Sequence, residues 1–321
     1  MIRLDLSSCK GFAHHRSGWG FCISQLKSLH SKSGIFVDDF IERSFSWEVS
    51  SYYHGNNPYN LPYQKDWVGF IHNPPNVPNW FDVYNSPQAI LSRDVFQQSL
   101  KTCKCLITLS KYLKDWLQPK VNVPVISIKH PTEIPENKWT PEKFLSQPRI
   151  PLVQVGYWLR KLDAIQKLQC GPRYHKVWLP SNYDYALTML DTYQKTQELF
   201  RDNHFQWGGV QIHKFLDNEL FDDMMCRCVV LIDLYDSSAN NAVIECIARN
   251  TPILVNKISP IVEYLGEKYP LYFECLTEAS ELLTNTNKIF EAHSYLKKMN
   301  KTWISGKSFV ASLQQKLLDI K

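Results

Sequence analysis

Short apolar runs alternate with amphipathic stretches along this chain, and this alternation limits the folds open to it more than any other feature. A short apolar run is typical of a buried strand, whereas apolar residues at intervals of three and four are typical of one face of a helix. Strands joined through helices pair in parallel, because each helix returns the chain to the end of the sheet where the strand began. We therefore expect an α/β fold of parallel sheets with helices on both faces.

The expected strands cover residues 2–6, 68–71, 106–109, 125–128, 152–155, 177–179, 210–212, 229–234 and 253–255. The expected helices cover residues 20–30, 88–100, 111–117, 183–200, 219–227, 240–249, 261–267, 279–293 and 307–318. Two stretches rich in proline and aromatic residues, 47–64 and 72–87, are expected as ordered loops.

The chain of 321 residues is long enough for two α/β domains. A proline-rich stretch over residues 131–151 interrupts the alternation and is typical of a linker. We expect an N-terminal Rossmann-like domain over residues 1–138, a linker over 139–151 and a C-terminal Rossmann-like domain over 152–300. The two domains would face each other with the carboxyl ends of their strands, where such folds bind ligands.

Composition excludes several classes of protein. Hydrophobic residues make up 44% and charged residues 21% of the chain, which is a globular composition. The net charge of +5 is spread along the chain without a block of Lys and Arg, so we expect no nucleic acid partner. No apolar run reaches the ~18 residues that span a bilayer, and the start of the chain lacks the apolar core of a signal peptide.

The cysteines favour a reducing compartment. There are nine, an odd number, in a chain too large to need disulfides. The pairs Cys103 with Cys105 and Cys226 with Cys228 lack the two-residue gap of a zinc knuckle. We expect reduced, buried thiols and a soluble protein of the cytoplasm.

The stretch over residues 229–266 is the most informative about chemistry. An apolar strand is followed there by Ser237, Ser238 and Asn240, and each of these side chains can cap the next helix. The free N–H groups at a helix start, with the positive end of the helix dipole, can hold a diphosphate. Glu245 lies farther inside that helix after apolar residues, so its carboxylate needs a partner. That partner is either the two hydroxyls of a ribose or a neighbouring Lys or Arg.

This stretch resembles the donor-binding segment of glycosyltransferases with the GT-B fold, especially those of the retaining family-four type. Glu245 matches the second Glu of the family motif, which implies that it binds the ribose of the donor nucleotide. Residues 250–253, Asn-Thr-Pro-Ile, match the family's Gly-x-Pro-Val turn. Ser237 stands where the family has its first Glu, a contact to the donor sugar, so the donor sugar and the stereochemistry stay open.

Residues 152–161 resemble the family's strand–glycine–basic segment. The resemblance implies that Arg160 and Lys161 neutralise the donor diphosphate, because the departing nucleotide is an anion that must be stabilised away from bulk water. A solvated pair of cations at a helix start is the alternative. The full donor-binding set that we expect is Gly18, Gly156, Arg160, Lys161, His213, Ser237, Ser238, Asn240, Asn241 and Glu245.

On the N-terminal side, the resemblance implies that His72, at the end of a strand, faces the reacting centre. His72 therefore joins Arg160 and Lys161 as a candidate catalytic residue, although a lone His in a loop is often structural. The candidates on the acceptor side are Arg16, Trp19, His72, Asn73 and His130. In the family the C-terminal tail returns to the first domain, so we expect residues 301–321 to form a helix that packs there.

The sequence contains no Asp-x-Asp, the motif with which the other large glycosyltransferase architecture holds a divalent metal. We therefore expect no metal and no cofactor. The resemblance implies transfer of a hexosyl or pentosyl group, with retention, from a UDP- or GDP-sugar to a hydroxyl of a glycan, glycolipid or glycoprotein. The alternatives are a non-catalytic protein that binds nucleotide sugars, a sugar-nucleotide epimerase on the same fold, and a transferase that acts on modified DNA.

Overall fold

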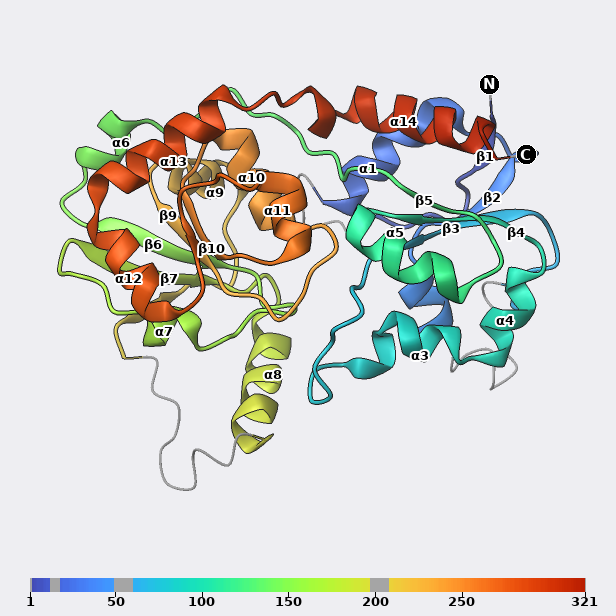
Figure 1. Ribbon diagram of the computed structural model, residues 1–321, viewed down its shortest axis with the longest axis horizontal. Helices are drawn as coiled ribbons and strands as arrows, with labels where there is room; N and C mark the ends of the chain where they lie inside the picture. The colour runs from blue at the N-terminus through green and yellow to red at the C-terminus, as the bar shows by residue number, and fades with distance from the viewer. Residues whose placement is uncertain (1, 12–17, 49–59, 197–207, 321) are drawn as a thin grey trace. The chain divides into compact units, whose positions relative to one another are not determined.

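The computed structural model describes residues 2–11, 18–48, 60–196 and 208–320. The chain divides into two compact units. Unit 1 contains Met1–Glu133, Asp236–Asn241 and Thr302–Lys321, and unit 2 contains Ile134–Tyr235 and Ala242–Lys301. Each unit has its own parallel sheet flanked by helices (Figure 1), so the expected α/β class with two parallel sheets is confirmed. In the ranges described, no helix is both long enough and apolar enough to cross a membrane.

The sheet of unit 1 has five parallel strands in the order β1-β2-β3-β4-β5. They are β1 (Leu4–Asp5), β2 (Ile35–Asp38), β3 (Trp67–Ile71), β4 (Cys103–Thr108) and β5 (Val125–Ser127). The α-helices of this unit are α1 (Trp19–Leu26), α3 (Pro87–Leu91), α4 (Asp94–Leu100), α5 (Lys111–Leu117) and α14 (Gly306–Leu318). Shorter helical turns are η1 (Lys27–Leu29), η2 (Arg43–Trp47), η3 (Val83–Asn85), η4 (Gln118–Lys120) and η5 (Thr302–Ile304).

The strands of unit 1 bury both faces, because successive side chains point to opposite sides of a sheet. Val68 and Phe70 of β3 point into a cluster covered by α1 and α14, which lie side by side in Figure 1. Trp67 and Ile71 of the same strand point into a second cluster, formed with α3, α4 and α5. The sheet is therefore fixed from both sides.

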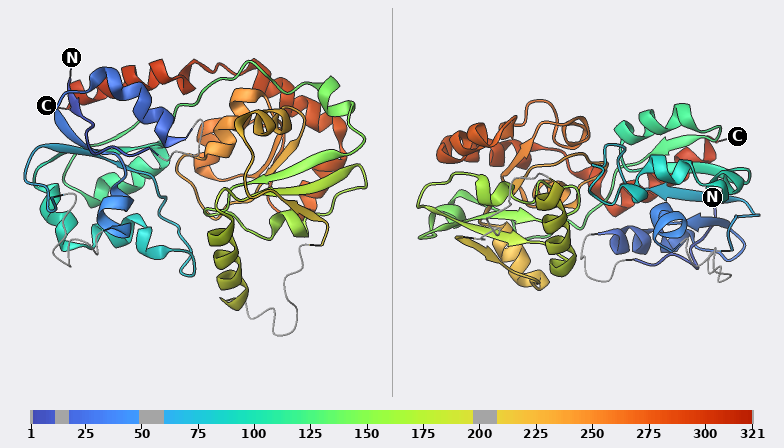
Figure 2. Two further views of the ribbon diagram at one scale, coloured as in Figure 1. Left: turned by 180° about the vertical axis from the view of Figure 1, so that it is seen from behind. Right: turned by 90° about the horizontal axis from the view of Figure 1, so that it is seen from below.

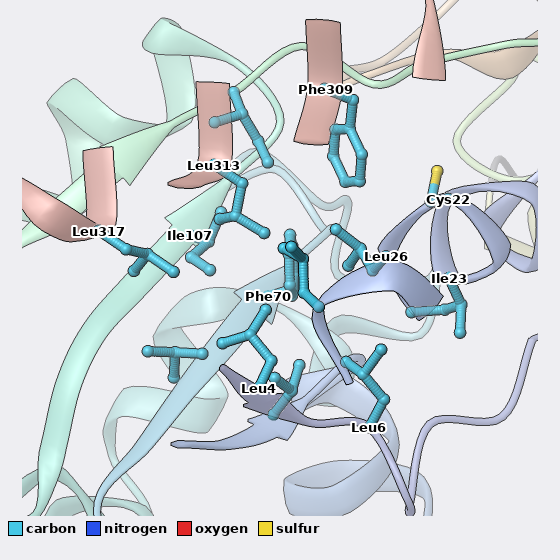
Figure 3. Close-up of a cluster of buried hydrophobic side chains, with 14 of the residues drawn as sticks. Leu4, Leu6, Cys22, Ile23, Leu26, Phe70, Ile107, Phe309, Leu313 and Leu317 are labelled. Carbon is cyan, nitrogen blue, oxygen red and sulfur yellow. The ribbon is translucent and has the colours of Figure 1, made fainter. Parts of the chain in front are cut away.

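The last helix of the chain is part of the core of unit 1. Phe309, Leu313 and Leu317 of α14 are buried and turn toward the strand side chains Phe70 and Ile107 (Figure 3). Ile2 and Ile320 pack against the same cluster, and in Figure 2 the blue first strand and the red last helix belong to the same unit.

The sheet of unit 2 has six strands in the order β11-β10-β9-β6-β7-β8, all parallel. They are β6 (Ile150–Val155), β7 (Tyr174–Leu179), β8 (Val210–Ile212), β9 (Val229–Ile232), β10 (Ile253–Asn256) and β11 (Tyr272–Phe273). The helices are α6 (Pro141–Leu145), α7 (Ala164–Lys167), α8 (Tyr183–Thr196), α9 (Asn218–Met225), α10 (Asn241–Arg249), α11 (Ser259–Leu265), α12 (Leu276–Thr284) and α13 (Thr286–Lys298). This is the strand order of the dinucleotide-binding fold, in which the chain reverses its direction across the sheet between the first and fourth strands, here β6 and β9.

The stretch over residues 139–151, which we expected to be a linker, belongs to unit 2. Trp139 is fully buried and its indole N–H donates to the carbonyl of Cys228 at 2.8 Å. Pro141 opens α6, where proline fits because the first N–H groups of a helix need no intrahelical partner. Pro141 therefore marks the start of a helix inside a packed unit.

Every expected strand is present, but β2 and β11 were not expected. Two expected helices are each divided, residues 88–100 into α3 and α4 and residues 279–293 into α12 and α13. Between α12 and α13 the Asn285 side chain accepts from the N–H groups of Asn287 and Lys288 at 3.1 and 3.3 Å, so it caps a new helix start. Of the expected helix over residues 183–200, the last four positions lie outside the described residues.

The packing of α14 predicts that Phe309→Ala destabilises the protein by about 3–5 kcal/mol, because the substitution leaves a cavity in a close-packed cluster. Leu318→Ala on the same helix is the matched control, since Leu318 is 54% exposed, and its effect should stay within about 0.5 kcal/mol. Urea unfolding followed by circular dichroism measures both. Equal effects of the two substitutions would contradict this account of the core.

Candidate functional site

The first turn after β6, at the carboxyl end of the strand that pairs with β9, is shaped by Gly156. Its φ of +79° is a left-handed conformation that side chains rarely adopt. A Cβ at this position would also lie 3.1 Å from the guanidinium of Arg160. Glycine is therefore required here both by the backbone and by the close approach of Arg160.

The guanidinium of Arg160 lies folded over this turn. Its Nε donates to the carbonyl of Val155 at 3.1 Å and its Nη1 donates to the carbonyl of Trp158 at 2.6 Å. Burial lowers the pKa of Arg160 to about 10, against an opposing effect of Tyr157. Arg160 thus stays cationic at neutral pH and is held at the strand end by backbone acceptors.

Lys161 is paired with a carboxylate that our sequence reasoning missed. Its Nζ lies 2.9 Å from Oδ1 of Asp233, and its backbone N–H donates to the Asp233 carbonyl at 2.8 Å. The Lys161 side chain is 43% exposed, whereas that of Asp233 is 5% exposed. Burial raises the pKa of Asp233, and the neighbouring Lys161 opposes that rise. The pair joins the turn after β6 to the residue after β9, so the cation stands directly at the reversal point of the sheet.

Two further groups define this edge of unit 2. Asn256 at the end of β10 exchanges two hydrogen bonds with the backbone of Leu234, both at 2.9 Å, and so fixes the path of the chain after β9. His213 follows β8, and its backbone N–H donates to the carbonyl of Trp178 at 3.0 Å. The structure therefore brings Gly156, Arg160 and Lys161 together and places His213 at the end of an outer strand.

The segment before α10 is anchored within unit 1. Asp236 accepts from the N–H of Asn76 at 2.9 Å and from the hydroxyl of Tyr112 at 3.0 Å through one oxygen. Its other oxygen accepts from the N–H of Ser237 at 2.7 Å. The Ser238 hydroxyl lies 3.1 Å from that of Ser110, which caps α5. These contacts fix the segment that precedes the helix start.

The four candidate donor residues of this segment differ in exposure. Ser237, Ser238 and Asn240 are buried, whereas Asn241, the first residue of α10, is exposed. Ligands can therefore reach Asn241 and the helix start more readily than the buried hydroxyls.

The sequence left two possible partners for Glu245, the hydroxyls of a ribose or a neighbouring Lys or Arg. In the structure Glu245 pairs with Arg249, one turn later in α10. The Arg249 side chain is 1% exposed and also pairs with Asp222, to which its Nε donates at 3.0 Å. A buried guanidinium between two carboxylates is a satisfied structural group.

In unit 1, His72 follows β3 and is enclosed by rings. Its ring stacks on Phe40 with centroids 3.9 Å apart and an interplanar angle of 6°, and it meets Trp19 edge-on at 4.4 Å. Its Nε2 lies 3.0 Å from the carbonyl of Asp39, which can only accept, so Nε2 carries the proton. Burial lowers the pKa of His72 to about 3, an effect opposed by the Asp39 carbonyl. His72 is therefore neutral at physiological pH.

A group of buried charges that the sequence did not point out surrounds His72. Asp39 accepts from the indole of Trp19 at 3.0 Å and pairs with Arg43. Glu42 accepts from the backbone N–H groups of His72 and Asn73 through one oxygen, at 2.8 and 2.7 Å. Its other oxygen is buried and has no hydrogen-bond partner among the residues that the structure describes. The Asp-Asp-x-x-Glu-Arg run at 38–43, directly after a strand, was the signal available in the sequence.

The remaining acceptor-side candidates hold the backbone in place. Asn73 is buried and its amide donates to the carbonyl of Asn85 at 3.0 Å. His130 is buried, with Nδ1 2.7 Å from the Pro131 carbonyl and Nε2 3.5 Å from Sγ of Cys22. Gly18 stands at the N-cap of α1. Arg16 lies outside the described residues.

Neither protein-family models nor curated protein sequences match this chain. Solved structures do match. Sucrose-phosphate synthase from Thermosynechococcus elongatus is 10% identical, with 89% of this chain and 73% of that chain covered and a TM-score of 0.62. Anabaena HepE in complex with UDP and glucose is 13% identical, with 89% and 78% covered and a TM-score of 0.61. A UDP-forming trehalose-phosphate synthase from Burkholderia xenovorans is 12% identical, with 94% and 77% covered and a TM-score of 0.56.

These likenesses show the fold. The chain has the GT-B fold of glycosyltransferases, with two Rossmann-like units. At identities this low, the likeness extends to the arrangement of the elements and carries no residue roles with it.

The buried Glu42 predicts a specific pH dependence of stability. Burial raises the pKa of Glu42 from 4.5 to about 7, against the hydrogen bonds from Asn73, its own backbone and His72. Its protonated form is favoured by folding, so its stabilising contribution is complete below pH 4.5 and is lost as the pH rises through 7. Glu42→Gln, which cannot ionise, should therefore gain about 1–3 kcal/mol relative to wild type between pH 4.5 and 8. Thermal unfolding at a series of pH values measures the difference, and a difference independent of pH would contradict the burial of the charge.

Proposed function

We propose that the protein is a glycosyltransferase that moves a sugar from a nucleotide-diphosphate sugar to an acceptor hydroxyl. The observation that carries this proposal is the cationic edge of a Rossmann-ordered sheet, Gly156 with Arg160 and Lys161, in a chain with the GT-B fold. The structures of similar fold support a UDP-sugar donor, because they include complexes with UDP and with UDP-glucose and a UDP-forming enzyme. A GDP-sugar fits the same chemistry.

The diphosphate would lie at the reversal point of the sheet in unit 2. Lys161 is the cation most open to a phosphate, since its side chain is 43% exposed. Arg160, whose guanidinium is held over the same turn, would add a second positive charge. Two fixed cations can take the place of a metal ion opposite a leaving diphosphate, because they stabilise charge that develops in the transition state. The proposal therefore includes no metal and no cofactor.

Within unit 2, the first turn of α10 from Ala242 onward would contribute backbone N–H groups to the same phosphates. Asn241 opens this helix, and the N–H groups of a first turn attract anions. Ser237, Ser238 and Asn240 would shape the loop that leads into it. The base would lie near His213, at the end of β8.

For Glu245, a role at the donor ribose requires the carboxylate to divide its hydrogen bonds between Arg249 and the ribose hydroxyls. A carboxylate has two oxygens and about four acceptor positions, so one oxygen can stay with Arg249 while the other meets a hydroxyl. A comparison of UDP with 2′-deoxy-UDP tests this role. The preference for UDP should be lost in Glu245→Gln, and an unchanged preference would leave Glu245 as a partner of Arg249 alone.

The neutral His72 points to a reaction without a protein base. A ring with a pKa of about 3 holds a transferred proton poorly at neutral pH. Its Nδ1 is suited to accept a hydrogen bond from a sugar hydroxyl, because Nε2 is committed to Asp39. In the retaining transfer that we propose, the departing phosphate would accept the proton of the acceptor hydroxyl.

A second candidate function is supported by the partners that Lys161 and Arg160 already have within the protein. Lys161 is paired with Asp233, Arg160 with carbonyl groups, and Ser237 stands at the position of the family's first Glu. A protein that binds nucleotide sugars without turning them over is consistent with these features. Release of free nucleotide from a nucleotide sugar would exclude this candidate.

The donor site predicts that Lys161→Met weakens the binding of UDP or GDP about 10- to 100-fold, because one charge-assisted hydrogen bond to phosphate is lost. Lys167→Met is the matched control, since Lys167 forms a similar ion pair with Asp163 at 2.6 Å in the same unit. Isothermal titration with each nucleotide measures both variants. Equal affinities of Lys161→Met and wild type would contradict the placement of the diphosphate.

A further inference from the structure

Three large apolar side chains are exposed on unit 1, and one of them, Trp47, is linked to His72 through the ring of Phe40. Trp47 is 39% exposed, Val83 is 39% exposed and Tyr84 is 50% exposed. Single exposed apolar residues are ordinary on a protein surface, but contiguous ones mark binding surfaces. We refer to Trp47, Val83 and Tyr84 together as the aromatic shelf.

The two segments that carry the shelf are fixed to each other. The Ser46 hydroxyl, next to Trp47, lies 2.9 Å from the carbonyl of Tyr84 and 2.7 Å from Oδ1 of Asn85. The guanidinium of Arg93 donates to the Tyr84 carbonyl at 3.1 Å and to the Ser46 hydroxyl at 3.2 Å. The backbone segments that carry Trp47 and Tyr84 are therefore joined by hydrogen bonds.

A continuous series of rings connects the shelf to His72. The ring of Phe40 stacks on His72 at 3.9 Å and meets the ring of Trp47 at 5.1 Å, with an interplanar angle of 41°. Only one ring thus separates Trp47 from the candidate reacting centre. This spacing suits a molecule with one unit at His72 and a second unit over Trp47.

The backbone that presents Trp47 is itself unusual. The turn η2 (Arg43–Trp47) is a π-helix, and the N–H of Glu48 donates to the carbonyl of Arg43 at 3.0 Å. Such single turns are rare and occur often at functional sites, since the extra residue redirects the side chains that follow. Side chains hold the turn in place: Arg43 pairs with Asp39, and the Ser44 hydroxyl donates to Asp38 at 3.1 Å. Asp39 therefore contacts both His72, through its carbonyl, and the turn that carries Trp47, through Arg43.

We infer that the aromatic shelf binds a sugar residue of the acceptor, so that the acceptor is an oligosaccharide whose terminal residue lies at His72. The inference rests on the proposed function. An aromatic ring offers a flat, electron-rich face to the C–H bonds on one side of a pyranose. Arg93, whose guanidinium donates to the Tyr84 carbonyl, is a polar group beside the shelf that can also donate to sugar hydroxyls. A lipid chain would need a longer apolar groove than these three exposed side chains provide.

The test compares Trp47→Ala with Trp47→Phe and Trp116→Ala on an array of immobilised oligosaccharides. Trp116 is the matched control, because it is a half-buried tryptophan of the same unit near the far end of α5. Wild type and Trp116→Ala should bind the same glycans. Trp47→Ala should lose at least about 10-fold in affinity, the equivalent of one stacked ring. Trp47→Phe should keep most of it.

The outcomes separate this inference from the proposed function. Equal glycan binding by Trp47→Ala and wild type, or wild-type binding to phosphatidylcholine vesicles and to no glycan, overturns the inference. Titration of wild type with UDP and GDP is a separate measurement, and failure there overturns the proposed transfer while the array result still stands. Unfolding temperatures of the variants show that a lost signal is not a lost fold.

Discussion

The arrangement of unit 2 depends on the parallel pairing of β6 with β9. Leu152, Val153 and Gln154 pair with Val229, Val230 and Leu231, and on either side of this pair the chain proceeds in opposite directions across the sheet. Because the connections leave toward different faces, the space beyond these two strand ends stays open to a ligand. The turn at Gly156, the ion pair of Lys161 with Asp233 and the hydrogen bonds of Asn256 all serve to shape that edge. The donor chemistry proposed for this protein follows from the position of two cations there.

Unit 1 depends in a similar way on a few buried acids. Asp39 fixes Trp19 and Arg43, and Glu42 fixes the backbone at His72 and Asn73. Buried carboxylates are costly unless they are paired, so their presence beside a strand end is a feature that pure packing would not require. The consequence for chemistry is an imidazole held neutral in one tautomer. Under the proposed function, such a ring would orient a hydroxyl rather than remove its proton, and the leaving phosphate would accept the proton.

Much of the fold could be predicted from the sequence, because buried parallel strands are apolar runs that stand out from their surroundings. The strand β2 was missed since it ends in Asp38 and is followed by further charges, and β11 has only Tyr272 and Phe273. Asn250 was matched to a glycine of the family turn, and its φ of +61° is the left-handed conformation of such a position. The side-chain contacts of the candidate site were harder to predict, because the residues that form each contact are distant from each other in the sequence. Glu42 meets His72 across 30 residues and Ser110 meets Ser238 across 128, and no periodicity reports such pairs. For Glu245 the difficulty was different. Ribose hydroxyls and a neighbouring Lys or Arg can both pair with a carboxylate, so the sequence alone did not distinguish them.

The central claim is that a nucleoside diphosphate binds at the β6–β9 edge of unit 2. Hydrogen–deuterium exchange of the full chain, with and without a saturating concentration of UDP or GDP, tests it most directly. The account predicts slower exchange in the peptides that contain Gly156 to Lys161 and the first turn of α10, with the peptides of α4 and α14 unchanged. Unchanged exchange in those two regions with either nucleotide, or protection confined to other segments, would contradict it.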